Sequence, residues 1–292
     1  MLQFENIIMK KSEPIYYVNG KYIPKNEAKI SVSDLGLLRG YGVFDFLVTY
    51  NGGRPFLIKR HLKRLYNSAK LIGLEIPYKT SFIEKLIIKT INKNKNGKEK
   101  GIRIIITGGE SENAISLGKK PTIVISLNDR KRFPESLYKK GAKVVTFDFN
   151  RESPQAKSLN YIQAVKANIL ARKKDAIESV YIHKKNNKVF EGTTSNLFLI
   201  KNEKIITPDG ETLPGITREL VMSMCKKLYP TKMREVKINE LYHADELFLS
   251  ASNKEILPVV KVDNTVIGNG KPGEVTKKIM AEFRKFIDQG RW

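Results

Sequence analysis

Short apolar runs separated by turn residues fill the first fifty positions of the chain. The runs Ile15 to Val18 and Lys21 to Ile23 flank Asn19-Gly20, the kind of dipeptide that most strongly favours a two-residue hairpin turn. A longer apolar run, Val43 to Tyr50, is followed by a second turn segment at 51–53. The pattern therefore predicts antiparallel strands in this part of the chain.

Helical periodicity begins after Lys59. The apolar side chains there recur three and four positions apart and the pattern stops at Gly73, as expected for an amphipathic helix that faces a core. A second helix is predicted from Ser81 to Ile91, and two strands follow, Ile102 to Thr107 and Thr122 to Leu127. The first part of the chain is thus expected to mix strands and helices.

A polar, basic stretch that contains Pro134, at residues 128–140, interrupts this pattern and is the best position for a boundary. We therefore predict a small α/β domain at residues 1–127, an interdomain connection at 128–140 and a large domain at 141–292. The strands and helices expected in the large domain are strands at 143–149, 180–183, 196–200 and 204–207, and helices after Asn160, from Thr217 to about Leu228 and from Gly273 to Ile287.

The formal net charge of +23, from 53 basic and 30 acidic residues, is of the kind found in nucleic-acid-binding proteins. The basic residues are mostly lysines, however, and they are spread over the whole chain without a recognised nucleic-acid-binding module. The densest basic run, at 93–100, has the composition of a solvated turn. We therefore expect no nucleic-acid partner.

Other function classes are disfavoured by the residues that the chain lacks. The single cysteine, Cys225, cannot form an internal disulfide, and the three histidines are not spaced as metal ligands. No run approaches the roughly 18 to 20 apolar residues that span a bilayer, and the start of the chain lacks the apolar segment and cleavage site of an export signal. We expect a cytoplasmic protein with no metal and no membrane partner.

One glycine pattern suggests a nucleotide site and is better explained as a turn. Gly268, Gly270 and Gly273 match the G-x-G-x-x-G pattern of dinucleotide-binding proteins. Such a site also needs a second strand and an acidic residue about 20 positions further on, and too little chain follows Gly273 for either. We interpret the segment as a turn that leads into the last helix.

Four separated segments carry the functional signal when they are read together. They are His61-Leu-Lys-Arg64, Lys157-Ser-Leu-Asn-Tyr161, Glu191-Gly-Thr-Thr-Ser-Asn196 and Leu213-Pro-Gly-Ile-Thr-Arg218. In this order and at this spacing they resemble the class IV aminotransferases, the branched-chain and D-amino-acid aminotransferase family, which are pyridoxal-phosphate (PLP) enzymes of fold type IV. The resemblance covers nearly the whole chain. It implies an α/β (α+β) two-domain fold, with a smaller N-terminal α/β domain and a larger C-terminal domain that has a barrel-like β core.

Transamination requires an amine that forms an imine with the aldehyde of PLP, leaves when the substrate arrives and then moves a proton. Lysine meets all three requirements, and the resemblance assigns this catalytic role to Lys157. It also implies that the carboxylate of Glu191 lies beside the pyridine nitrogen, which must stay protonated for PLP to withdraw electrons. Tyr161 matches the family's tyrosine near the phenolic oxygen of the cofactor.

The phosphate of PLP needs cations and backbone donors. A glycine turn precedes the predicted helix at Thr217, so the amides of Ile216 and Thr217 can point at an anion along the helix dipole. This inference comes from the residues alone. The resemblance adds Arg64 as the phosphate arginine and Ser252 as a hydroxyl donor to the same group.

The substrate brings a carboxylate, for which arginine is the best-shaped partner. Arg39 and Arg103 lie in segments that line the substrate pocket of the family, and a charge inside the apolar run around Arg103 favours a pocket-facing position. Phe44 is expected to contact an aliphatic or aromatic side chain. The resemblance also places Ala251 and Asn253 at the substrate, and it implies a homodimer in which Arg39 is donated by the neighbouring subunit.

The sequence is therefore interpreted as a PLP-dependent aminotransferase that moves an amino group between an amino acid and a 2-oxo acid such as 2-oxoglutarate, through a Schiff base on Lys157. The donor is a branched-chain L-amino acid or a D-amino acid, because Arg39 and Gly108 match neither subgroup of the family fully. Two alternatives stay open. One is a lyase similar to 4-amino-4-deoxychorismate lyase, and the other is a basic binding protein on an inactive enzyme fold.

Overall fold

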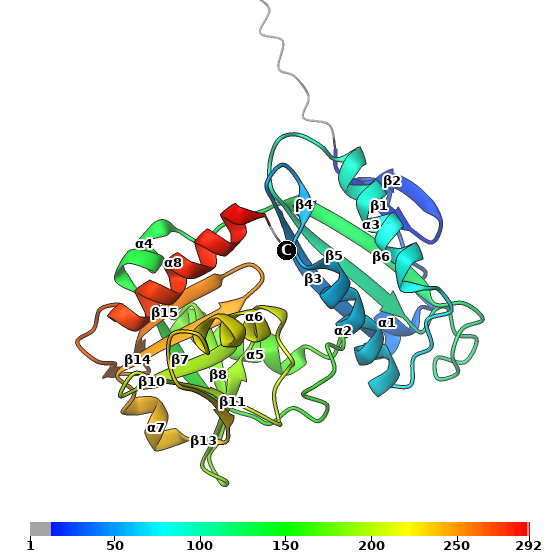
Figure 1. The fold of residues 1–292 in the computed structure, drawn as a ribbon. Helices are drawn as coiled ribbons and strands as arrows, with labels where there is room; N and C mark the ends of the chain where they lie inside the picture. Colours follow the sequence, from blue (N-terminus) through cyan, green and yellow to red (C-terminus); the bar gives the residue numbers. More distant parts are fainter. Residues whose placement is uncertain (1–12, 291) are drawn as a thin grey trace, which may run out of the picture.

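The computed structural model describes residues 13–290 and Trp292, and its strands form two sheets with helices packed against them (Figure 1). Residues 1–12, on which the expectation of no export signal depends, lie outside this described part. No helix within the described residues is long and apolar enough to cross a membrane.

The first sheet is antiparallel and has the strand order β2-β1-β6-β5-β3-β4. Asn19 and Gly20 have φ angles of 42° and 95°, the left-handed backbone that a two-residue hairpin turn requires, so the predicted hairpin is confirmed. The strands of this sheet are β1 (Ile15–Val18), β2 (Lys21–Pro24), β3 (Gly42–Tyr50), β4 (Arg54–Pro55), β5 (Lys100–Thr107) and β6 (Thr122–Asp129).

Two amphipathic helices, α2 (Ile58–Leu71) and α3 (Thr80–Lys93), pack on the first sheet. Their apolar side chains, among them Leu65 and Ile87, join the buried isoleucines of β5 and β6 in one core. Both helices were predicted to within a few residues. The sequence did not indicate the short helices η1 (Lys25–Glu27) and α1 (Leu35–Arg39).

The segment that was expected to be an irregular connection contains regular structure at both ends. Strand β6 runs on to Asp129, and helix α4 spans Glu135–Lys140. Pro134 directly precedes α4, where a residue without an N–H is tolerated, so a proline taken as a loop signal instead stands at the start of a helix. The first sheet ends before α4 and the second begins after it, and we keep the domain division at 128–140 as a proposal.

The second sheet has ten strands within the described residues, in the order β12-β11-β10-β14-β15-β7-β8-β9-β13, with β16 paired to β15. It is mixed, and it curls so that β9 also contacts β10 and β11, as expected of a barrel-like core. Its strands are β7 (Ala142–Asp148), β8 (Glu178–His183), β9 (Lys188–Gly192), β10 (Asn196–Lys201), β11 (Lys204–Pro208), β12 (Thr231–Arg234), β13 (Val236–Lys237), β14 (Glu246–Ala251), β15 (Glu255–Val262) and β16 (Thr265–Val266).

Four further helices accompany the second sheet. Helix α5 packs on β7 and β8, whereas α6 and α8 pack on the side of β14. Gly273 is the N-cap of α8, which confirms that the glycine pattern there is a turn and a helix start. The four helices are α5 (Ile162–Lys173), α6 (Ile216–Cys225), α7 (Ile238–Tyr242) and α8 (Glu274–Gln289).

A shared apolar core joins the two parts of the molecule. Tyr50 at the end of β3 and Phe56 just after β4 are almost fully buried and pack in one cluster with Phe198 of β10 and Phe283 of α8. The chain end beside α8 lies next to the β3–β4 hairpin in Figure 1. The angle between the two sheets is therefore fixed by packing, which keeps a cavity between them in a defined shape.

Candidate active site

A cavity of about 230 Å³ lies where the end of the first sheet meets the second. Every site residue predicted from the sequence lines this cavity, with the single exception of Arg39. The lining residues that were predicted are Phe44, Arg64, Arg103, Lys157, Tyr161, Glu191, Ile216, Thr217, Ala251, Ser252 and Asn253.

Lys157 is held in this cavity by its backbone. Its N–H donates to the Ser68 hydroxyl at 3.1 Å, and its carbonyl accepts from the N–H of Phe44 at 2.9 Å. Its Nζ lies 4.6 Å from the centre of the Phe44 ring. Burial, aided by the positive charge of Arg64, lowers the pKa of Lys157 to about 7. A large fraction of the amine is therefore neutral at neutral pH, and only the neutral amine is a nucleophile.

The cation beside Lys157 is fixed by Asp45, which has no exposed surface. Nε and Nη2 of Arg64 each donate to one oxygen of this carboxylate at 2.8 Å, a bidentate pair. His61 adds a third hydrogen bond at 2.7 Å. Burial alone would raise the pKa of Asp45, but Arg64 and His61 hold it well below its usual value. Asp45 is therefore charged, and it stabilises the arginine in the cavity wall.

His61 is a neutral partner in this cluster. Burial lowers its pKa even though Asp45 opposes the shift. Because a charged carboxylate only accepts hydrogen bonds, Nδ1 of the neutral ring carries the proton that is donated to Asp45. The cluster thus contains one full cation and one full anion, with Arg64 facing the cavity.

Glu191 lies at the end of β9, is 4 % exposed, and has a hydrogen-bond partner on each oxygen. Oε1 accepts from Nη1 of Arg151, and Oε2 accepts from the side chain of Asn196 and the N–H of Leu213, each at 3.0 Å. Burial raises the pKa of Glu191 although Arg151 and Leu213 lower it. A further cation placed against this carboxylate would offset part of its desolvation.

The start of α6 offers an anion site in the same cavity. The N-cap, Gly215, has no side chain, so the first amides of the helix, Ile216 and Thr217, keep their donors for another group. A Cβ at Gly215 would lie 1.8 Å from the side-chain oxygen of Asn196, so this close turn requires glycine. Among the described residues, the Ser250 hydroxyl in the cavity wall is buried without a hydrogen-bond partner.

An aromatic wall and an arginine complete the cavity. The rings of Phe44 and Tyr161 meet edge to face with centres 5.3 Å apart, and burial raises the pKa of Tyr161. The guanidinium of Arg103 lies 5.7 Å from the centre of the Phe44 ring. Arg103 is exposed rather than buried in its apolar strand, because its side chain projects into the open part of the cavity.

Arg39 does not reach Lys157 within one chain. It is the last residue of α1, is exposed, and donates to the carbonyl of Leu38 at 2.9 Å. It lines a separate cavity of about 420 Å³, which shares Arg151 and Tyr161 with the Lys157 cavity. The two predicted substrate arginines, Arg39 and Arg103, are therefore not brought together in a single chain.

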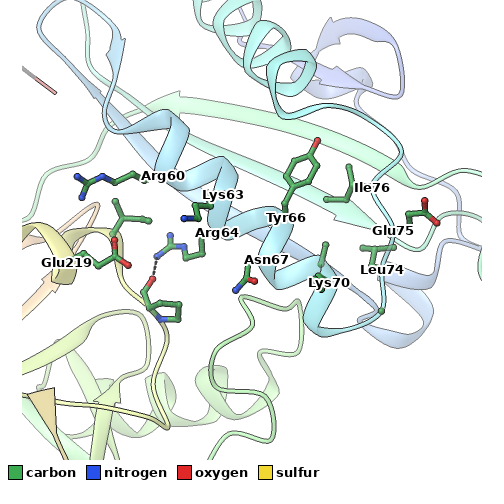
Figure 2. A pocket seen from close by; sticks show the side chains of 14 residues that line it. Arg60, Lys63, Arg64, Tyr66, Asn67, Lys70, Leu74, Glu75, Ile76 and Glu219 are labelled. Carbon is green, nitrogen blue, oxygen red and sulfur yellow. Dashed lines mark hydrogen bonds between the residues drawn. The ribbon is translucent and has the colours of Figure 1, made fainter.

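A larger groove of about 970 Å³ lies on the other side of Arg64 (Figure 2). It runs between α2 and the start of α6, and Figure 2 shows Arg64 pointing across it toward the carbonyl of Pro214, to which Nη1 donates at 3.3 Å. Arg60, Lys63 and Glu219 line this groove, but Lys157 does not. The smaller cavity is therefore the one that combines a nucleophile, an anion site and a buried carboxylate.

Comparison with known proteins identifies the family of this chain. The family model for amino-transferase class IV matches residues 42–262. The chain is 35% identical over 278 residues to a Methanocaldococcus jannaschii protein named as a putative branched-chain-amino-acid aminotransferase, covering 92% of this chain and 94% of that protein. It is 30% identical over 279 residues to a D-alanine aminotransferase of Staphylococcus epidermidis, covering 93% and 97%.

The chain belongs to the class IV aminotransferase family. Solved structures agree with this assignment. The branched-chain amino acid aminotransferase of Escherichia coli superposes with a TM-score of 0.88 at 26% identity, over 95% of both chains. A second branched-chain amino acid aminotransferase, complexed with N-(5'-phosphopyridoxyl)-L-glutamate, superposes with a TM-score of 0.86 at 27% identity, over 96% of both chains. The protein is thus a PLP-dependent aminotransferase with the fold of these type IV enzymes, as predicted.

The relatives named here are aminotransferases, so the comparisons favour transamination over the lyase alternative and over a basic binding protein. The cavity of this aminotransferase also fits a phosphorylated aldehyde. It presents an amine of lowered pKa, helix amides and an arginine for an anion, and a buried carboxylate for a ring nitrogen. A hydroxyl in its wall, Ser250 Oγ, has an unused donor.

Several residues of the aminotransferase site were missed by the sequence argument. Asp45 is the only charged residue in the apolar run of β3, which was a usable signal, since a charge inside such a run is buried only with a partner. His61 was noted only as part of a motif. Arg151 and Asn196, which hold Glu191, gave no local signal, because their importance arises from contacts across the sheet.

Replacing Asp45 with Asn should weaken both the fold and the cofactor site. The amide keeps the shape but leaves the charge of Arg64 buried without a counter-ion, so the free energy of unfolding should fall by about 3 kcal/mol. Because Arg64 also loses its bidentate orientation, PLP affinity should fall by about 10- to 100-fold. Urea unfolding and PLP titration of the apoenzyme measure the two effects.

Asp34 provides the matched control. It is also fully buried but lies outside the cavity, where it accepts from the N–H of Gly36 and the hydroxyl of Thr107. Asp34→Asn should lower stability and leave PLP affinity unchanged. Unchanged PLP affinity in Asp45→Asn would contradict the assigned link between Asp45 and the cofactor site.

Proposed function

We propose that this aminotransferase moves an amino group between a branched-chain amino acid and a 2-oxo acid such as 2-oxoglutarate, with PLP bound covalently through Lys157. The observation that carries the proposal is the position of Lys157. Its amine has a pKa lowered to about 7 and shares one cavity with the helix start at Ile216 and the buried carboxylate of Glu191. These are the three contacts that a phosphorylated pyridine aldehyde requires.

In this proposal, Arg64, the amides of Ile216 and Thr217, and the hydroxyl of Ser252 would bind the phosphate. The geometry of the helix start supports the assignment, since its amides have no side-chain cap to satisfy them. Glu191 would pair with the protonated pyridine nitrogen, and Arg151 and Asn196 hold its carboxylate in place. Tyr161 would lie beside the phenolic oxygen, and its contact with Phe44 next to Lys157 supports this assignment.

The reaction then depends on proton movement at Lys157. PLP, when bound, withdraws electrons from the α-carbon of the substrate. Lys157 would hold the cofactor until the substrate amine replaces it, and its freed amine would then accept the proton of the substrate α-carbon and hold it for return. A base of pKa near 7 suits both directions of this transfer at neutral pH, because it is readily charged and discharged. Water would release the first 2-oxo acid, and the second 2-oxo acid would then take up the amino group, with Lys157 moving the proton in the opposite direction.

The substrate side of the cavity supports an apolar amino acid. Phe44 and Phe46 line it, Arg103 supplies a cation for a carboxylate, and Ala251 and Asn253 lie on the facing loop. The relative that is 35% identical bears the name of a branched-chain enzyme, which favours L-leucine, L-isoleucine and L-valine as donors. A D-amino acid is the second candidate, because a relative at 30% identity is named a D-alanine aminotransferase.

A homodimer would bring Arg39 of one copy to the cavity of the other. Two exposed apolar surfaces support this proposal. Ile162, Val165 and Ile169 form a stripe on α5 at helical spacing, and Leu37 and Leu38 are exposed on α1 beside Arg39. Exposed apolar stripes of this kind are typical of surfaces that a second chain covers.

The reaction is tested by incubating the protein with PLP, 2-oxoglutarate and each donor as separate L and D enantiomers, and measuring the glutamate formed. We expect transfer from branched-chain L-amino acids. Lys157→Ala should lower the rate by about 10³-fold or more, because both the covalent link and the proton carrier are lost. Lys204→Ala, a change at an exposed lysine of β11, is the control and should leave the rate unchanged.

Two results of that assay would contradict the proposal. Glutamate formation that persists in Lys157→Ala would remove the lysine from the mechanism. Pyruvate release from added 4-amino-4-deoxychorismate, with no 2-oxo acid present, would replace transfer by a lyase reaction. Transfer from D-amino acids alone would leave the reaction in place and assign the second candidate donor.

The carboxylate contacts are tested by Arg103→Ala and Arg39→Ala. Each substitution should raise KM for the amino donor by about 10- to 100-fold, the value of a lost charge-assisted hydrogen bond, without changing the absorbance of bound PLP. Arg132→Ala, at an exposed arginine that pairs with Glu99 and does not line the cavity, serves as the control. Unchanged KM in both variants would remove the two arginines from the substrate site.

A further inference from the structure

Two loops form one wall of the Lys157 cavity. The first, residues 192–196, connects β9 to β10 and follows Glu191; the second, residues 251–254, connects β14 to β15 and carries Ser252. Behind this wall, away from the cavity, the loops are joined by two charged side chains, Glu178 and Lys254. Neither of them lines the cavity.

The carboxylate of Glu178, on β8, accepts hydrogen bonds from the hydroxyl and N–H groups of the first loop. Oε1 accepts from the hydroxyl of Thr193 at 2.9 Å, the hydroxyl of Thr194 at 2.8 Å and the N–H of Thr194. Oε2 accepts from the hydroxyl of Ser195 at 2.7 Å. Three consecutive residues of the loop are therefore fixed by one carboxylate.

Lys254, at the end of the second loop, completes the cluster. Its Nζ lies 3.2 Å from Oε2 of Glu178 and donates to the hydroxyl of Thr194 at 2.7 Å. Glu178 is 2 % exposed and Lys254 3 %. Burial alone would raise the pKa of Glu178, but Lys254 and the hydroxyl donors hold it below its usual value, so the pair is ionic. A buried ion pair with this many hydrogen bonds fixes geometry more than it adds stability.

The cluster is also tightly packed at Gly192. A Cβ there would lie 2.4 Å from the hydroxyl oxygen of Ser195 and 3.0 Å from the carboxyl carbon of Glu178. The first loop therefore runs directly against the carboxylate. Replacing Glu178 or Lys254 should therefore displace this loop and, with it, the cavity wall.

We propose that Glu178 and Lys254 are a positioning pair, which holds the loop after Glu191 at a fixed distance from the loop that carries Ala251, Ser252 and Asn253. The pair thereby sets the affinity for substrate and for the cofactor phosphate without touching either. The inference rests on the proposed function of this cavity.

The test is Lys254→Met in the holoenzyme. Loosening the second loop should raise KM for both the amino donor and the 2-oxo acid by about 10- to 100-fold, the cost of a misplacement of roughly 1 Å, while kcat at saturating substrate and PLP changes less than the KM values. The control is Lys100→Met, at a buried lysine whose Nζ lies 2.7 Å from Asp129 and which does not line the cavity. It should lower the melting temperature but leave both KM values unchanged.

A double variant separates positioning from stability. Glu178→Gln with Lys254→Met removes both buried charges together, so its melting temperature should recover toward that of the wild type, while KM should stay raised because the two loops are no longer tied. Recovery of KM together with stability would overturn the proposal, as would a KM increase in Lys254→Met no larger than that in Lys100→Met. Wild-type protein without any amino transfer would instead contradict the proposed function itself.

Discussion

The bidentate contact between Asp45 and Arg64 is the interaction on which the site depends. Asp45 is fully buried in β3, Arg64 lies on α2, and the guanidinium also reaches the carbonyl of Pro214 in the second part of the molecule. One ion pair therefore fixes a cation where the two sheets meet. Together with burial, this cation lowers the pKa of Lys157. The contact that fixes Arg64 in the cavity wall therefore also favours the neutral form of the Lys157 amine.

The other groups of the site lie in short polar segments at the ends of strands and at the start of a helix. Glu191 lies next to the last residue of β9, Ser252 follows β14, and the amide of Ile216 begins α6, so three rigid elements converge on one cavity. Rigid elements hold such groups more accurately than free loops do. The shared core around Tyr50 and Phe283 keeps the first sheet in a fixed position relative to these three elements.

A second buried link crosses the same junction. The carboxylate of Glu255, at the start of β15, accepts from the hydroxyl of Tyr50 and from Nη2 of Arg130, each at 2.8 Å. Glu255 also has a φ of 58°, an uncommon backbone conformation for a residue other than glycine. Its position directly after Lys254 means that the loop carrying Ser252 is anchored at its end to both sheets.

Turn residues and apolar periodicity were enough to predict the elements that neighbouring residues determine. The hairpin at Asn19-Gly20 and the helix that ends near Gly73 follow from turn chemistry and apolar periodicity. The anion site at Ile216 could also be predicted, because a glycine before a helix exposes its amides. The residues of the site that lie far apart were assigned by resemblance, and the structure brings all of them except Arg39 to one cavity.

What the sequence did not reveal depends on contacts between distant elements. The importance of Asp45 appears only when β3 meets α2, and that of Arg151 only when its segment meets β9. Lys254 gave no sign of its role, because a lysine in a basic chain is normally a solvated charge. Arg39 lies outside the cavity of its own chain, so its proposed role depends on a second copy.

We infer that Lys157 binds the cofactor because its surroundings lower its pKa. The most direct measurement is a short pulse of PLP on the apoenzyme at a series of pH values, followed by borohydride reduction and quantification of the labelled peptides by mass spectrometry. We expect label to appear selectively on Lys157 and to rise with pH through about 7. Label on another lysine, or a rise only near the ordinary lysine value of about 10.4, would contradict it.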